Sequence, residues 1–144
     1  MKVNALAVLR FFLWFSCAFH LIVGVLLNVW PAFPQMMAGY YGASVDFTPQ
    51  FLYIIKPLGA FMIMVGLVVM AAARDPLNNP AIVYALVVLL AIRGLQRFVF
   101  QDAIVNDLAI EASRNVVNGV VFLLLAVIFA VLFRLASNDK AATT

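Results

Sequence analysis

Five polar side chains stand inside otherwise apolar stretches of this sequence: His20, Lys56, Arg93, Gln96 and Arg97. Arg93 and Arg97 are four residues apart, a spacing that places two side chains on the same face of a helix. Arginine donates paired, charge-assisted hydrogen bonds to carboxylates and phosphates. The group therefore predicts a site for an anionic or carbonyl-bearing ligand, with Gln96 beside the two arginines and Lys56 adding positive charge.

His20 is the one histidine of the chain, and it lies within a long apolar stretch. A histidine in a membrane can ligate a haem-type metal or relay a proton, and His20 is the only candidate axial ligand. Ligation of a haem by two histidines would need a second one, and the sequence has no CxxCH motif and no cluster of Cys and His. We predict no metal site and leave the cofactor unassigned, because a hydrogen bond across helices explains His20 more simply.

Four acidic residues offer a competing explanation for cations at membrane depth. Asp46, Asp102, Asp107 and Glu111 lie in the segments that flank the apolar stretches, where they can pair with the arginines. Long arginine side chains can also extend to the membrane surface. The sequence is compatible with both alternatives: a ligand site, or arginines that pair with these acids or extend to the membrane surface.

These side chains need elements that hold them inside a membrane. Of the 144 residues, 67% are hydrophobic and only 10% are charged, whereas a soluble domain has about 45–50% apolar and about 25% charged residues. A chain of this size cannot bury so much apolar surface within itself. The composition predicts an all-α integral membrane protein, a single domain formed by a four-helix transmembrane bundle. Its first partner is the lipid bilayer, and no basic stretch with interleaved aromatic residues indicates nucleic acid.

Proline, glycine and polar clusters divide the chain into four predicted helices, at about 4–30, 49–73, 80–110 and 114–136. The segment 31–48 combines proline and glycine with aromatic and methionine side chains, which predicts an interfacial loop or a lid over the bundle. Residues 137–144 are small and polar, and we expect a disordered tail there.

The third helix carries the most information about the site. Its apolar run, residues 81–92, covers only about 18 Å at 1.5 Å per residue, whereas the hydrocarbon core of a bilayer is about 30 Å thick. A spanning helix therefore brings Arg93 and Arg97 to membrane depth, and a re-entrant helix that never crosses is the alternative. With four spans, the five polar residues named first all fall in the centre of the bundle or in its half away from the termini.

Charge distribution gives the expected orientation. Four spans place both termini on one side of the membrane. If Arg93 and Arg97 are discounted because they lie within a helix, the basic residues of the ends and connections favour cytoplasmic termini.

The order of several short motifs resembles that of a known family. Arg10 precedes a His20-x3-Gly24 pattern, and then follow IKPLGAFM, AARDP and the R-x2-QR pattern that ends at Arg97. Together they resemble the BphX-like family of small bacterial four-helix membrane proteins and, more distantly, the DoxX group. The resemblance implies a protein of a bacterial inner membrane, sometimes associated with the degradation of aromatic compounds. It supplies no catalytic mechanism, and the positions it points to are Lys56, Arg74, Asp75, Arg93 and Arg97.

No catalytic motif accompanies these residues: there is no glycine-rich phosphate loop, no nucleophile elbow and no Ser/His/Asp arrangement. We predict a non-catalytic membrane protein that acts by association. Either it binds a hydrophobic molecule with a polar or anionic head, such as a quinone, a lipid or an aromatic acid, or it is an accessory subunit of a larger membrane complex. The alternative is a small redox enzyme or a proton-linked transporter that uses His20, Arg93 and Arg97, although the internal repeats typical of transporters are not evident.

Overall fold

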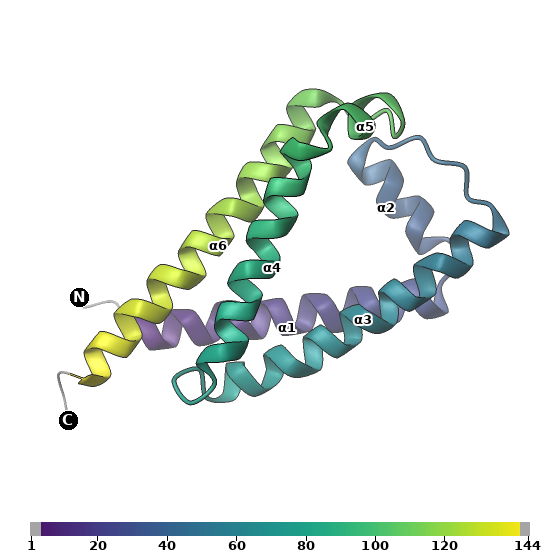
Figure 1. The fold of residues 1–144 in the computed structure, drawn as a ribbon. Helices are drawn as coiled ribbons and strands as arrows, with labels where there is room; N and C mark the ends of the chain where they lie inside the picture. Colours follow the sequence, from purple (N-terminus) through teal and green to yellow (C-terminus); the bar gives the residue numbers. More distant parts are fainter. Residues whose placement is uncertain (1–3, 142–144) are drawn as a thin grey trace.

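The computed structural model describes residues 4–141 of the chain. The helices of this part are α1 (Ala5–Val29), α2 (Phe33–Tyr41), α3 (Pro49–Arg74), α4 (Pro80–Val99), α5 (Gln101–Asn106) and α6 (Ala112–Ala141). Four of them, α1, α3, α4 and α6, are long and apolar enough to cross a membrane (Figure 1). The predicted fold class, an all-α bundle of four long apolar helices, is confirmed.

Local signals in the sequence fix where these helices start and stop. The side-chain oxygen of Asn4 accepts a hydrogen bond from the backbone N–H of Ala7, and that of Thr48 accepts one from Phe51, each over 3.2 Å. Both are N-caps, which satisfy backbone donors that the first turn leaves free. Pro49 then occupies the first position of α3, where its missing N–H costs nothing.

A compact polar turn connects α3 to α4. The Asn78 side-chain amide donates to the Asp75 carboxylate over 2.6 Å, and the Asn79 amide donates to the Asp75 backbone carbonyl over 2.8 Å. The second bond uses one of the backbone carbonyl groups that the end of a helix leaves without partners. The turn therefore reverses the chain within a few residues and brings α4 back beside the end of α3.

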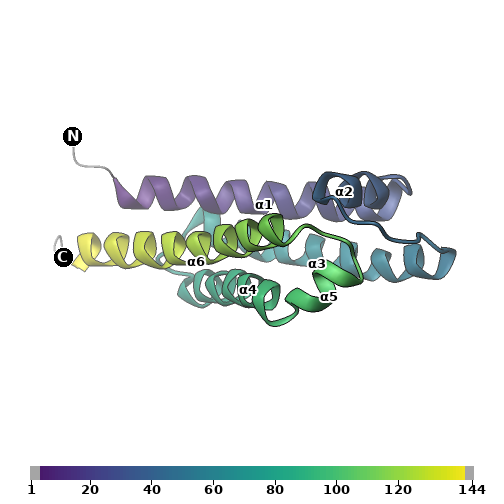
Figure 2. The ribbon, with the colours of Figure 1, turned by 90° about the horizontal axis from the view of Figure 1, so that it is seen from above.

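The long helices form two antiparallel hairpins, α1 with α3 and α4 with α6. The hairpins meet where the start of α1, the end of α6 and the α3–α4 turn lie, and they diverge toward α2 and α5 (Figure 1). Figure 2 shows the same helices from above, with the described chain ends at one end of the molecule and α2 and α5 toward the other. The bundle is therefore a wedge with a closed end and an open end.

The closed end of the wedge holds the apolar core. Leu9 of α1, Val83 of α4 and Phe133 of α6 are buried there, with exposed fractions of 0%, 0% and 6%. On α4 the buried residues Val83, Leu86 and Leu90 repeat at spacings of three and four. This repeat is the seam by which two helices pack side by side.

Glycines bring the helices of each hairpin into close contact. A Cβ atom on Gly24 of α1 would lie 2.7 Å from the carbonyl oxygen of Gly59 on α3. In the other hairpin, a Cβ atom on Gly94 of α4 would lie 3.0 Å from the carbonyl oxygen of Gly119 on α6. Small residues allow this approach of two backbones, so the glycines let the helices of each hairpin pack closely.

Two predicted boundaries around the open end are wrong. The helix expected at 80–110 ends at Val99, because Phe100 leaves helical geometry with φ −104° and ψ 26°, and the chain continues as the separate helix α5. The segment 31–48 is not a loop throughout, because it contains α2. Gly42 terminates α2 in the left-handed conformation, with φ 71°, which glycine adopts without steric cost.

The predicted disordered tail is also wrong for the residues that the structure describes. α6 continues to Ala141, and residues 142–144 lie outside the described range. Ser137 donates its hydroxyl to the carbonyl of Phe133 over 2.8 Å, so this polar side chain is satisfied within the helix. Lys140 and Ala141 are good helix formers, which is compatible with a helix that extends beyond the apolar run.

Candidate functional site

Beside its buried seam, α4 carries positive charge where the hairpins separate. The buried seam continues from Leu86 and Leu90 to Gly94, and the exposed Arg93 and the half-buried Arg97 stand on either side of this glycine in the sequence. Arg93 follows the first residue of α4 by 13 positions, which is about 20 Å along the helix axis. The two arginines therefore lie in the part of the span away from the closed end, as the sequence predicted.

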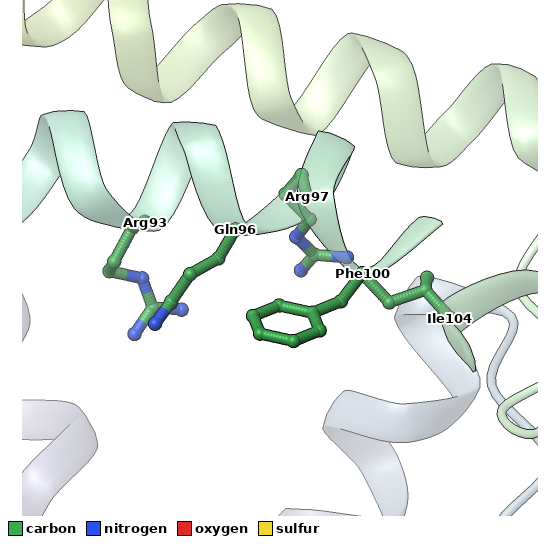
Figure 3. A pocket seen from close by; sticks show the side chains of 5 residues that line it. All are labelled: Arg93, Gln96, Arg97, Phe100 and Ile104. Carbon is green, nitrogen blue, oxygen red and sulfur yellow. The ribbon is translucent and has the colours of Figure 1, made fainter. Parts of the chain in front are cut away.

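A pocket of about 390 Å³ lies along this part of α4, lined by Arg93, Gln96, Arg97, Phe100 and Ile104. Figure 3 shows the side chains of Arg93 and Gln96 extending from α4 on the side away from the α6 ribbon. The structure thus brings together three of the five residues predicted from the sequence. The break at Phe100 contributes as well, because it places a phenyl ring beside the arginines.

Arg97 is held in place by Asn115 of α6. The Asn115 side-chain amide donates to the backbone carbonyl of Arg97 over 2.7 Å, and Nη1 of Arg97 donates to the side-chain oxygen of Asn115 over 3.3 Å. Asn115 is fully buried, with an exposed fraction of 0%. Arg97 also contacts α2, because its guanidinium lies 5.8 Å from the centroid of the Tyr41 ring. Arg97 therefore connects α4 to both α6 and α2.

Arg93 has a different environment. Its guanidinium lies 5.1 Å from the centroid of the Phe122 ring of α6, a favourable cation–π distance. Among residues 4–141, no carboxylate forms an ion pair with Arg93 or Arg97. The competing explanation, that acids in the flanking segments pair with these arginines, has no support in the described structure. Both guanidinium groups keep donors that an external anion can use.

Lys56 and His20 do not line this pocket. Lys56 is exposed on α3. His20 is half-buried on α1, where its Nδ1 lies 2.7 Å from the carbonyl oxygen of Ser16, one turn earlier. An Nδ1–H proton donates to that carbonyl, so His20 is satisfied within its own helix. In the described part of the chain no three His, Cys, Asp or Glu side chains are arranged to hold a metal ion.

α2 bridges the open end of the wedge (Figure 1). Nη1 of Arg114, in α6, donates to the backbone carbonyl of Tyr40 over 3.2 Å, at the end of α2 where free carbonyls favour a cation. The backbone N–H of Ser44 donates to the carbonyl of Leu108 over 2.9 Å. The segment that follows α1 is therefore attached to the start of α6, close to the arginine pocket.

Asn115 and Asn118, at the start of α6, were not among the site residues predicted from the sequence. Asn115 turns out to hold Arg97, whereas the side-chain nitrogen of Asn118 is buried without a hydrogen-bond partner. The available signal was the polar residue type at the start of an otherwise apolar helix. It could not show which amide faces α4.

Comparison with known proteins gives no assignment: no protein-family model, no curated protein and no solved structure matches the chain. The resemblance to BphX-like proteins therefore stays a prediction. What the site does must follow from its own geometry.

Proposed function

We propose that this protein binds an amphipathic small molecule with an anionic head in the pocket on α4, and that it acts without catalysing a reaction. The observation that carries this proposal is a pocket lined by two arginines and a glutamine, with no carboxylate partner for either arginine among residues 4–141. A charged side chain inside a membrane helix costs free energy, up to about 2.5–3.5 kcal/mol at the centre of the span on insertion scales and less toward its end. Charge-assisted hydrogen bonds to a bound anion would offset this cost.

The surroundings of the pocket fit a ligand that is apolar apart from its head. Phe100 and Ile104 form an apolar wall beside the arginines. Arg93 and Gln96 are exposed rather than sealed in the core, so the pocket is open at the depth of the bilayer. A ligand dissolved in the membrane can therefore reach the arginines without passing through water.

The double variant Arg93→Gln, Gln96→Leu is expected to retain at least about tenfold less amphiphile than the unchanged protein. The reason is that each hydrogen bond to a charged group contributes about 1.5–3 kcal/mol. Arg97 is left unchanged because it also holds α4 to α6. The measurement is native mass spectrometry after mild extraction from the native membrane, with the lipid extract analysed in parallel.

The matched control is Arg134→Gln, which removes a positive charge from an exposed position near the other end of α6. Equal retention by the double variant and the control would contradict the proposed function. Larger protein subunits that copurify in place of a small molecule would also contradict it, and they would identify the chain as an accessory subunit of a membrane complex.

For the membrane itself, we propose a bacterial inner membrane with both termini in the cytoplasm. This proposal rests on the charge distribution and on the resemblance described above. Single cysteines at Asn138, near the end of α6, and at Asn106, at the end of α5, test it in a Cys17→Ala background, since both asparagines are exposed. A membrane-impermeant maleimide is expected to label the Asn106 site in cells with an opened outer membrane, and the Asn138 site only after lysis. The reverse pattern would contradict the orientation, and labelling of both sites from one side would contradict four spans.

A further inference from the structure

We propose that the head recognised by this pocket is a phosphate monoester, and that a lipid carries it. This inference rests on the proposed binding of an amphipathic anion and specifies its chemical class. It follows from the charge of the pocket, from the number of donors it offers and from its depth in the span.

The charge of the pocket matches a group with close to two negative charges. Arg93 and Arg97 line it together, and among residues 4–141 neither is paired with a carboxylate. A carboxylate carries one negative charge and leaves one arginine uncompensated. A phosphate monoester carries about −1.5 to −2 at pH 7. A phosphodiester, with a single charge, leaves the same deficit as a carboxylate.

The donors of the pocket also exceed what a carboxylate can use. A single arginine fork satisfies a carboxylate through two parallel hydrogen bonds. Arg97 uses Nη1 for Asn115 and keeps its other guanidinium donors. No side chain or backbone group of residues 4–141 accepts a hydrogen bond from the Arg93 guanidinium, and Gln96 adds an exposed amide. Two arginines on successive turns suit an anion with three terminal oxygens, which accepts from both at once.

The depth of the pocket matches that of a lipid phosphate. α4 has 20 residues, a length of about 30 Å, which is about the thickness of the hydrocarbon core. Arg97 is two residues from the end of α4, and Phe100 and Ile104 lie beyond it. The pocket therefore extends from just inside the hydrocarbon core to the headgroup layer. A lipid phosphate reaches the arginines there while its chains stay among the apolar faces of the helices.

The experiment uses the full-length protein, delipidated in detergent and titrated with lipids of identical acyl chains, with binding read by native mass spectrometry. The probes are phosphatidic acid for the monoester, phosphatidylglycerol for the diester, phosphatidylcholine for the neutral headgroup and a free fatty acid for the carboxylate. Phosphatidic acid is expected to bind at about tenfold lower concentration than any of the others, since only it compensates both arginines. The Arg93→Gln variant is expected to remove this preference, and Arg134→Gln to keep it.

Two further measurements, a competition with inorganic phosphate and a titration at lower pH, test the source and the charge of the bound group. Inorganic phosphate at millimolar concentration is expected not to displace phosphatidic acid; displacement would overturn the lipid as the source of the phosphate. Lowering the pH from 7.5 to 5 is expected to reduce the preference, because a phosphate monoester loses its second charge near pH 6. Equal binding of the fatty acid or of phosphatidylglycerol would overturn the monoester while the proposed function stands. Failure of every amphiphile to bind would overturn both.

Discussion

Replacing Asn115 with leucine is expected to lower the free energy of unfolding by about 2–3 kcal/mol, because it removes both hydrogen bonds to Arg97 and leaves that residue's carbonyl and guanidinium without their partner. Leucine fills a similar volume, so the loss reports the polar contacts rather than a cavity. Unfolding in mixed micelles of a mild detergent and dodecyl sulfate, followed by circular dichroism, measures the change.

Asn118→Leu is the matched control for this variant. The side-chain nitrogen of Asn118 is buried but makes no hydrogen bond, so its removal takes away an unsatisfied donor. An unsatisfied buried polar group costs about 1–3 kcal/mol, and we therefore expect the stability to stay the same or to rise. An equal loss in the two variants would contradict the role assigned to Asn115.

The second large effect is expected at the contact between α1 and α3. Gly24→Ala places a Cβ atom 2.7 Å from the carbonyl oxygen of Gly59 and 2.8 Å from the backbone nitrogen of Ile63. Backbone atoms cannot turn away as a side chain can, so the two helices must separate. We expect a loss of about 2–3 kcal/mol in the free energy of unfolding, which is at the upper end of the usual cost of overpacking. The same mixed-micelle titration measures it.

Gly39→Ala provides the comparison for this substitution. A Cβ atom at Gly39, in the interior of α2, meets no other atom within 4 Å. Alanine is favoured over glycine inside a helix by about 0.8–1 kcal/mol, so this variant is expected to be unchanged or slightly more stable. If Gly24→Ala behaved in the same way, the close contact of α1 with α3 would not determine the stability of the hairpin.

The long helices could be predicted from the sequence because their signals are local. A span requires about 20 apolar residues, and the chain marks the limits with residues such as Pro31, Thr48 and Pro76. The depth of Arg93 and Arg97 followed from counting residues along a helix. The break at Phe100 carried no such mark, because neither proline nor glycine stands at that position.

The pairing of the helices and the partners of the site could not be predicted in the same way. In a membrane protein the faces toward lipid and toward neighbouring helices are both apolar. In α6, Val117 and Leu124 are exposed while Phe129 and Phe133 are buried, yet nothing in their residue types separates the two groups. For the same reason the sequence did not show that Asn115 faces Arg97, or that the hairpins diverge around the arginines.

The two hydrogen bonds between Arg97 and Asn115 have a consequence for the order in which the helices enter the membrane. The partner that satisfies Arg97 lies on α6, a helix that the ribosome completes only after α4 has emerged. Until α6 arrives, α4 must hold two guanidinium groups at membrane depth without the asparagine that contacts one of them. We therefore expect α4 to stay in contact with the insertion machinery until α6 has been synthesised. The two helices would then enter the lipid as a pair rather than independently.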